Sequence, residues 1–323
     1  MVNAKAPRTL REAILFFANY ENCHRAVLEI RWPDGVVRCP HCGSENVTYL
    51  ETQRRWKCYG NHPKAQFSLK VGTIFEDSAI GLEKWLPALW LLTTCKNGIS
   101  SYELARALGV TQKTAWFMLS RLRLALQAEH GGKLNGEVEA DETFIGGKAR
   151  NMHAAKRKRL GISQSRSMIG KVAVMGLLAR HGEDGSKVRL QVISNRRKHQ
   201  LEATVSEHVE VGSNLYTDSL RSYDRMGMRG YVHGVNDHAE AYVDGQVHTN
   251  GLENFWPLLK RALKGTYVSV EPFHLYRYLD EQAFRFNNRK MTDAARFVFA
   301  LKGILNRRLT YAALTGSELP QTC

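Results

Sequence analysis

Apolar residues recur along the chain in two different periods, and the period changes near residue 136. Before that point, residues 1–30 and 82–128 carry apolar side chains at helical spacing, as at Leu10, Ile14 and Phe17. Both segments are therefore predicted to be helical.

After residue 136, short runs typical of strands are interspersed with helical segments. The predicted strands are 136–146, 172–178, 188–193, 215–217 and 231–235. The predicted helices are about 198–208, 219–227, 255–263, 272–288 and 291–306. Three strands, a helix, a strand, a helix, a strand and then helices favour a mixed α/β sheet.

The charge of the chain is strongly positive. Its 323 residues include 46 Lys and Arg against 31 Asp and Glu, a net charge of +15 with a pI of about 9.6. Such a surplus favours a polyanionic partner, a nucleic acid or an acidic membrane surface, over a basic protein without one. No apolar run approaches the roughly 18 residues of a membrane span, no secretory signal is evident, and six cysteines are too few for a disulfide scaffold. These features predict a cytoplasmic protein.

The cysteines of residues 38–70 have the spacing of metal ligands. Cys39 and Cys42 form a C-x2-C knuckle, and Cys58 and His62 complete a second one. Three thiolates and an imidazole suit tetrahedral Zn²⁺ in a closed, structural site. His41, inside the first knuckle, is the alternative imidazole, and free buried cysteines are the alternative to a metal site.

Residues 100–122 predict a helix-turn-helix. Ser100 and Glu103 fit a capping box, Gly109 permits the turn, and Thr111 caps the second helix. The alternative is a helical hairpin that does not bind DNA. The side chains expected to remain free for bases and phosphates are Gln112, Lys113, Thr114 and Arg121.

Three acidic residues far apart in the sequence suit a two-metal nuclease centre, which needs carboxylates around two divalent ions roughly 4 Å apart. Asp141 lies within an apolar strand, where burial without a cation or partner is costly. Asp218 ends a later strand, although a helix N-cap would also explain it. Glu142 should face the side of the strand opposite to Asp141.

The third acidic candidate is Glu253. Lys260 follows it by seven residues, close to two helical turns, so the two side chains should share a face that holds a metal and a DNA phosphate together. A capping box from Asn250 is the alternative explanation of Glu253. Pro257 implies either a kinked helix or a helix that begins near Phe255.

A basic segment lies between Thr143 and Gly182, where no acidic residue occurs. We expect such a segment beside Asp141 to contact the phosphates of DNA. The alternative is a solvated surface loop. The basic residues of this segment include Lys148, Arg150, Lys156, Arg157, Lys158, Arg159, Arg166 and Lys171.

Taken together, these motifs resemble the IS1595 family of insertion-sequence transposases, which carry an ISXO2-like transposase domain. The resemblance covers nearly the whole chain. It is carried by Ile30–Gly35, Cys39–Gly43, Trp56–Cys58, Gln66–Asp77, Glu139–Gly147, Tyr216–Asp218, His248–Trp256, Leu259–Arg261, Gly265–Tyr267 and Arg285–Arg289. It implies an RNase-H-like DDE domain that acts with Mg²⁺ on the terminal inverted repeats of the element.

The resemblance leaves the third metal position open between Glu253 and Asn250, because the family is also described with Asn there, followed by Lys. We favour Glu253, since a carboxylate neutralises a metal and an amide only coordinates it. Two residues depart from the family pattern, Pro257 at a place that is usually polar and Val268 where His is common.

The predicted protein is thus a DNA transposase with a mixed α/β RNase-H-like catalytic domain, preceded by a small zinc ribbon and an all-α helix-turn-helix domain. The expected boundaries are an N-terminal helical segment 1–37, the ribbon 38–80, the helix-turn-helix domain 81–130, the catalytic domain 136–310 and a tail 311–323. Asp141, Asp218 and Glu253 are expected to hold Mg²⁺ or Mn²⁺, with Lys260 and Asn250 beside them and Arg261 among the DNA contacts. The expected partners are double-stranded DNA, both inverted repeats and target, and further copies of the chain, as a homodimer or larger assembly on DNA in the bacterial nucleoid.

Two other functions fit parts of the sequence. A zinc-ribbon and helix-turn-helix regulator with an inactive nuclease-like half would bind DNA without Mg²⁺-dependent cleavage. A Ser or Tyr recombinase would leave the protein covalently attached to DNA, but no hydroxyl in the sequence has a compelling activating environment.

Overall fold

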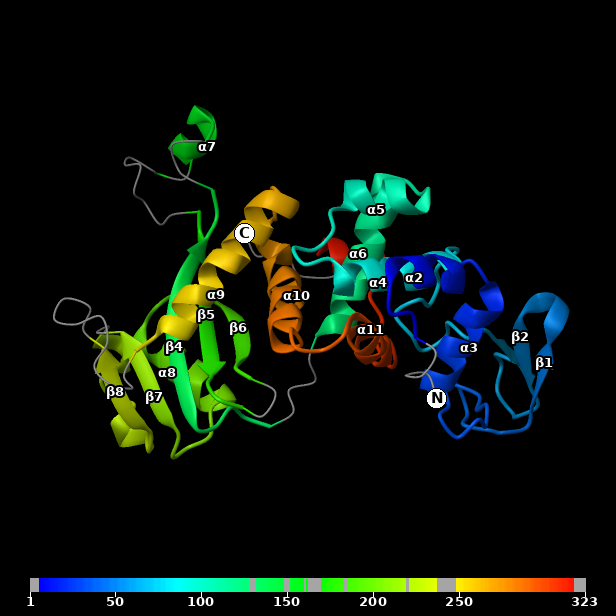
Figure 1. The fold of residues 1–323 in the computed structure, drawn as a ribbon, viewed down its shortest axis with the longest axis horizontal. Coiled ribbons are helices and arrows are strands. Elements are labelled where there is room, and N and C mark those ends of the chain that lie inside the picture. Colours follow the sequence, from blue (N-terminus) through cyan, green and yellow to red (C-terminus); the bar gives the residue numbers. More distant parts are fainter. Residues whose placement is uncertain are drawn as a thin grey trace. The chain divides into compact units, whose positions relative to one another are not determined.

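The computed structural model describes residues 6–127, 132–147, 152–159, 161, 170–182, 185–218, 221–236 and 248–316, drawn in colour in Figure 1. The chain forms two compact units. Unit 1 consists of Met1–Ala128 together with Met291–Cys323, and unit 2 of Glu129–Lys290.

Unit 1 begins with two capped helices. Helix α2 spans Leu10–Phe17 and helix α3 spans Tyr20–Arg31. The Thr9 hydroxyl accepts a hydrogen bond from the backbone of α2, and the Asn19 side chain does the same for α3, which satisfies amides that a helix start leaves unpaired.

A three-stranded antiparallel sheet follows, with strands in the order β1 (Val47–Leu50), β2 (Arg55–Cys58) and β3 (Gln66–Phe67). A single 3₁₀ turn, η1 (Glu51–Gln53), connects β1 to β2, and Arg54 closes it with a φ of 52°. This hairpin places Cys58 at the end of β2 that faces the first cysteine knuckle.

The remainder of unit 1 is helical. Its helices are α4 (Leu82–Thr94), α5 (Ser101–Leu108), α6 (Gln112–Leu126), α11 (Asp293–Lys302) and α12 (Tyr311–Thr315). Helix α4 is buried along most of its length and contacts α2, α3, α5, α6 and α11, which makes it the centre of this unit.

The C-terminal segment returns to unit 1, which corrects the boundary that the sequence suggested at 310. Helix α11 packs against α3, α4 and α6 through an apolar face that includes Phe297 and Leu301. Beyond it, the Ile74 amide donates to the Ile304 carbonyl at 2.9 Å. The α/β unit ends at Lys290 instead, because the apolar face of α11 is buried by helices from the first half of the chain.

The end of α11 predicts a sensitive position at Gly303. A Cβ atom there would lie 2.0 Å from the Ala125 carbonyl oxygen, so the helix ends must separate. We expect Gly303→Ala to destabilise the protein by about 1–3 kcal/mol, the usual cost of overpacking. The measurement is the denaturant midpoint, with Gly265→Ala as the matched control, since nothing lies within 4 Å of the added methyl there. Equal midpoints for the two variants would contradict this packing.

Unit 2 is built on a five-stranded mixed sheet in the order β6-β5-β4-β7-β8. Strands β4, β5 and β6 form an antiparallel meander, and β7 and β8 run parallel to β4. The strands are β4 (Glu137–Ile145), β5 (Val172–Ala179), β6 (Lys187–Ile193), β7 (Asn214–Asp218) and β8 (Val232–Asn236).

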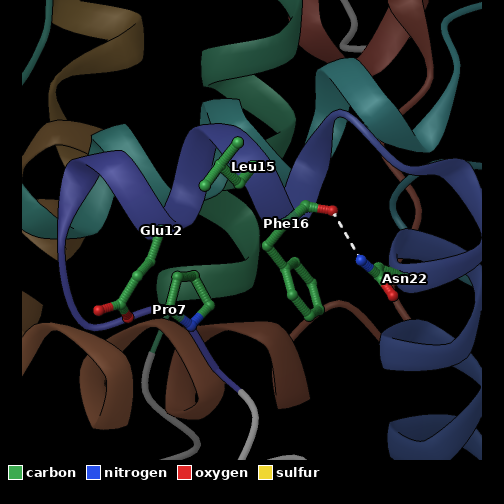
Figure 2. Close-up of a pocket in the computed structure, with 5 residues that line it drawn as sticks. All are labelled: Pro7, Glu12, Leu15, Phe16 and Asn22. Carbon is green, nitrogen blue, oxygen red and sulfur yellow. Dashed lines mark hydrogen bonds between the residues drawn. The ribbon is translucent and has the colours of Figure 1, made fainter.

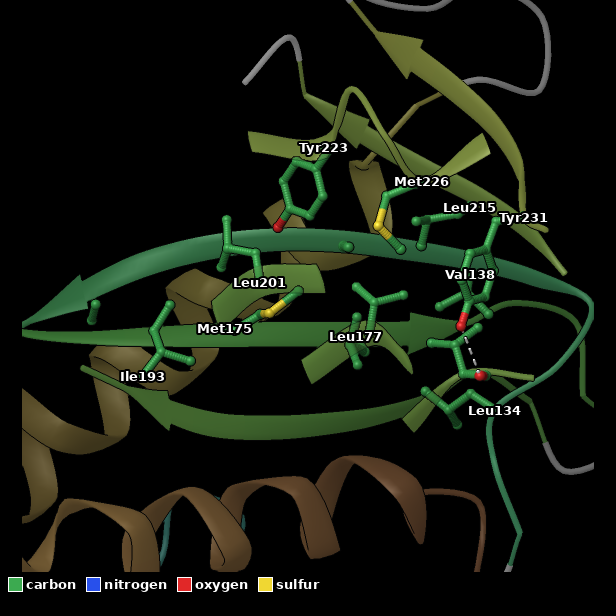
Figure 3. Close-up of a cluster of buried hydrophobic side chains, with 14 residues drawn as sticks. Leu134, Val138, Met175, Leu177, Ile193, Leu201, Leu215, Tyr223, Met226 and Tyr231 are labelled. Carbon is green, nitrogen blue, oxygen red and sulfur yellow. Dashed lines mark hydrogen bonds between the residues drawn. The ribbon is translucent and has the colours of Figure 1, made fainter. Parts of the chain in front are cut away.

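Helices cover the two faces of this sheet. Helix α8 (Lys198–His208) packs on one face, where Val138, Leu177, Leu201 and Tyr223 belong to one buried cluster (Figure 3). On the other face, α9 (Asn250–Arg261) and α10 (Leu275–Asn287) pack against alternate residues of the same strands. The short elements of the unit are α7 (Ala154–Arg159), η3 (Arg221–Tyr223), η4 (Gly227–Arg229), the π-helical turn η5 (Ala262–Thr266) and η6 (Pro272–His274).

Two predicted helices of unit 2 differ from the observed ones. Within the described part of 219–227 the chain forms 3₁₀ turns, in which Tyr223 and Met226 are buried against the sheet. Helix α9 begins at Asn250, earlier than Phe255, and continues through Pro257. Among the described residues, none of the helices combines the length and the apolar character that crossing a bilayer requires.

Candidate active site and metal centres

The four ligands predicted for zinc lie together in unit 1. Cys39 Sγ is 3.4 Å from His62 Nε2, Cys42 Sγ is 3.6 Å from Cys58 Sγ, and all four ligand atoms lie within 4.8 Å of one another. A tetrahedron with Zn–S bonds of about 2.3 Å has edges of about 3.8 Å, so this donor set fits Zn²⁺. The His41 ring lies 5.5 Å from the His62 ring, outside the cluster.

Backbone amides complete this cluster. The amide of His41 points at Cys39 Sγ (3.5 Å) and the amide of Gly60 at Cys58 Sγ (3.3 Å), as expected for thiolates held in knuckles. A Cβ atom at Gly60 would lie only 2.8 Å from Cys42 Sγ, which explains the glycine. The cluster is closed on all sides by protein donors, which indicates a structural site.

The helix pair α5–α6 has the predicted caps. Ser100 and Glu103 form a reciprocal capping box, Gly109 adopts a φ of 59°, and the Thr111 hydroxyl accepts from the Thr114 amide. At the start of α6, Lys113 is exposed, while Gln112 is half-buried and donates to the Ser101 hydroxyl at 2.8 Å.

The Arg121 side chain is buried, whereas the sequence predicted that it would be free to contact DNA. Its side chain is 5% exposed, and its guanidinium donates to the carbonyl oxygens of Ile74 (3.0 Å) and Glu76 (2.6 Å) and stacks on Phe117. Burial lowers the pKa of this guanidinium from its ordinary value. The prediction of a DNA contact is wrong, because α6 is enclosed from Met118 onward and Arg121 ties it to the preceding loop.

The acidic candidates of unit 2 lie where β4, β7 and α9 meet. Strand β4 alternates, so Val138 and Ala140 point to the α8 face while Glu139 and Asp141 point to α9. Ala140 pairs with Thr217 in the parallel β4–β7 ladder, which brings Asp218, the last residue of β7, beside Asp141 in the middle of β4.

The Asp141 carboxylate is held by two N–H donors. The Trp256 indole donates to Oδ2 and the Glu142 amide to Oδ1, each at 2.7 Å. Burial raises the pKa of Asp141, the two hydrogen bonds lower it, and the charges of Asp218 and Glu253 raise it further. Asp218 and Glu253 are therefore electrostatic neighbours of Asp141, and the net shift of its pKa is upward.

Glu142 lies on the opposite face, as strand alternation requires. Its carboxylate accepts a hydrogen bond from the Tyr223 hydroxyl and pairs with Arg196 Nε at 2.9 Å. Burial raises the pKa of both Glu142 and Tyr223. Because a guanidinium and a phenol already bind this carboxylate, we infer that Glu142 stabilises the strand rather than binding a metal.

Helix α9 positions Glu253, Asn250 and Lys260. Thr249 stands at the N-cap position and makes no side-chain hydrogen bond to the helix amides; its hydroxyl donates to Glu253 Oε1 at 3.1 Å. Asn250 is the first residue inside the helix, so it is not the N-cap that the alternative capping box required. Glu253 is exposed in the first turn, and Asn250 and Lys260, in the first and last turns, are half-buried.

A buried ion pair that the sequence reasoning missed fixes the start of α9. Glu139, 1% exposed, pairs with Arg180 Nε at 2.7 Å and accepts from the Leu252 amide at 2.8 Å. Arg180 also donates to His248, just before the helix. The sequence did contain a signal for this ion pair. Glu139 precedes Asp141 by two residues and so shares its face of the strand, and a buried carboxylate requires a partner.

The basic contacts predicted on α7 and at the end of α9 are exposed where the structure describes their side chains. Arg157, Lys158 and Arg159 are exposed on α7, and Arg261 is exposed in the last turn of α9. Lys156 belongs to α7 with its side chain outside the described residues, and Lys148, Arg150 and Arg166 also lie outside them. Arg285 instead forms a buried ion pair with Glu281.

A hollow beside α2 in unit 1 has a different character. It has a volume of about 360 Å³ and is lined by Pro7, Glu12, Leu15, Phe16 and Asn22 (Figure 2). The Asn22 amide donates to the Phe16 carbonyl at 3.3 Å, and Leu15 is 66% exposed. With a single carboxylate in an apolar rim, it offers no constellation for catalysis.

Unit 2 thus carries acidic side chains on two neighbouring strands of a mixed sheet, and unit 1 carries a Cys3His cluster. Residues 133–287 match the family described as the ISXO2-like transposase domain, and residues 18–60 match the transposase zinc-ribbon domain.

Two relatives carry related names. An uncharacterized protein in transposable element ISH50 of Halobacterium salinarum is 28% identical over 258 residues, 76% of this chain and 84% of the relative. An uncharacterized transposase-like protein of Haemophilus influenzae is 31% identical over 105 residues, 32% of this chain and 85% of the relative. The chain belongs to the IS1595 family of transposases.

Proposed function

We propose that this protein is a DNA transposase that cuts the terminal inverted repeats of its insertion sequence and joins the freed ends to target DNA. Asp141, Asp218 and Glu253 would form the active site, with Mg²⁺ or Mn²⁺ as the cofactor. The observation that carries the proposal is the position of Asp141 and Asp218 on the adjacent strands β4 and β7 and of Glu253 on α9, which packs against β4, with the charges of the other two acting on Asp141.

The residues present fit hard divalent cations. Carboxylate oxygens are the preferred ligands of Mg²⁺, and a bound cation would offset the burial and the neighbouring negative charges that raise the pKa of Asp141. When bound, such ions activate the attacking hydroxyl and stabilise the leaving oxygen. Glu253 is favoured over Asn250 as the third ligand, because it is a carboxylate whose charge already acts on Asp141.

The chain's other residues would bind and orient DNA. Lys260 and Asn250 lie on the same helix as Glu253 and would hold phosphates near the reacting bond. Arg157, Lys158, Arg159 and Arg261 are exposed cations suited to the backbone, and Lys113, Gln112 and Thr114 begin α6, where a recognition helix contacts bases. The sheet order β6-β5-β4-β7-β8 supports an RNase-H-like catalytic unit. Pairing of two transposon ends requires at least two copies of the chain.

Incubation of the purified protein with duplex DNA carrying the element's ends tests this function. We expect strand nicking at the ends with Mg²⁺ and none with EDTA, and no protein covalently attached to DNA. Specific binding without nicking under any divalent ion would instead support a DNA-binding regulator with an inactive nuclease-like unit.

A further inference from the structure

Gly176 lies directly opposite Asp141 in the antiparallel β4–β5 ladder. Side chains of opposite residues project from the same face of a sheet, here the face covered by α9. A glycine in the middle of a strand weakens it, and φ at Gly176 is not positive, so backbone conformation does not require this residue. The absent side chain leaves space beside Asp141.

Trp256 of α9 occupies that space. A Cβ atom on Gly176 would lie 2.6 Å from Cη2 and 2.8 Å from Cζ2 of the indole, closer than real Cβ contacts. Trp256 is 5% exposed and belongs to the core cluster between the sheet and α9. Only a glycine at 176 lets the ring lie this close to the strand.

From this position the indole N–H reaches the carboxylate. It donates to Asp141 Oδ2 at 2.7 Å while the Glu142 amide donates to Oδ1 at 2.7 Å. A carboxylate has about four lone-pair positions, so each oxygen keeps one for another partner. The indole N–H is a donor only and cannot act as a ligand of the metal ion.

We propose that Trp256 is a positioning residue that locks the Asp141 carboxylate in the orientation for metal binding, and that Gly176 is required to seat the Trp256 ring. This inference rests on the proposed function. The two N–H donors fix the carboxylate from the protein side and leave its remaining lone pairs for the ion. Outer-shell hydrogen bonds of this kind contribute about 10–100-fold to metal affinity.

The test is Mn²⁺ binding measured by electron paramagnetic resonance, without DNA. Trp256→Phe keeps an aromatic ring but removes the N–H, and we expect about 10-fold weaker binding. Gly176→Ala should weaken binding to a similar extent in the wild-type background and add little to Trp256→Phe. The matched control is Trp85→Phe, which also removes a buried indole donor, to the Ser78 hydroxyl at 3.3 Å, and should bind Mn²⁺ as the wild type does.

A second measurement covers the case in which Trp256→Phe does not fold. The chain has six tryptophans, and in a ¹⁵N spectrum the near-isosteric Asp141→Asn should shift one indole N–H signal, because its charged acceptor is lost. Mn²⁺ should broaden the same signal in the wild type.

The outcomes separate the two proposals. If the wild type binds Mn²⁺ and Trp256→Phe binds it with the same affinity, the role of Trp256 is overturned and the proposed function stays intact. The same holds if no indole N–H signal shifts in Asp141→Asn. Additive losses from Gly176→Ala and Trp256→Phe would overturn the role of Gly176. No Mn²⁺ binding by the folded wild type would overturn both proposals.

Discussion

Asp141→Asn is expected to reduce Mg²⁺-dependent nicking of the transposon ends by at least about 1,000-fold, the equivalent of about 4 kcal/mol of transition-state stabilisation. The substitution keeps the shape of the side chain and the space for Trp256 but removes the charge that would bind the cation. The measurement is the rate of nicking of end-labelled duplex DNA, with a gel-shift assay to show that DNA binding persists.

Glu207→Gln is the matched control for the loss of a carboxylate in the same unit. Glu207 is exposed at the surface of α8, where its carboxylate lies 4.0 Å from His208 Nε2. The Glu207→Gln variant should nick the DNA at the rate of the wild type. Equal nicking by Asp141→Asn and Glu207→Gln would remove Asp141 from the active site.

The same assay decides between the two candidates on α9. Glu253→Gln should approach the loss seen for Asp141→Asn, because a metal-binding charge disappears, whereas Asn250→Ala should retain more activity. The reverse order would assign the third metal position to Asn250.

Cys58→Ser is expected to abolish zinc binding and unfold the ribbon, the second large effect. Structural zinc sites contribute roughly 10 kcal/mol or more to the folding of small modules, and the sheet of β1, β2 and β3 is too small to replace that contribution. Metal analysis should find one Zn²⁺ per wild-type chain and none in the variant. Hydrogen exchange should accelerate in β1 and β2 and stay unchanged in the sheet of unit 2.

Cys95→Ser is the control, since Cys95 is half-buried and lies outside the Cys3His cluster. It should keep its zinc and its exchange protection. Full zinc content in Cys58→Ser would show that other residues hold the metal.

Local patterns were sufficient to predict much of this fold. Residue spacing predicted the Cys3His cluster, the capping box at Ser100 and the positions of the strands of unit 2, because each depends on a few neighbouring residues. The meeting of Asp141 with Asp218 and Glu253 was inferred from the order of elements and a family resemblance. It stays a prediction, with which the action of the Asp218 and Glu253 charges on the pKa of Asp141 agrees.

The features that were missed depend on packing between distant segments. Arg121 looked like a surface cation, but α6 is enclosed there and its guanidinium caps the carbonyls of Ile74 and Glu76. The bond from Trp256 to Asp141 depends on a glycine in another strand, which no periodicity indicates. The packing of α11 in unit 1 could not be predicted from its sequence, because an apolar helix face of this kind can pack in the core of either unit.

Because α11 belongs to unit 1, the unit that carries the zinc cluster is discontinuous in sequence, with the whole of unit 2 inserted into it. During synthesis its first half leaves the ribosome long before residues 291–308, which supply the partner of Ile74 and the cation that meets Asp77. That half must therefore stay incompletely packed until residues 291–308 have also been made. A chain interrupted after unit 2 would lack this closure, so we expect unit 1 not to complete its packing in such a fragment.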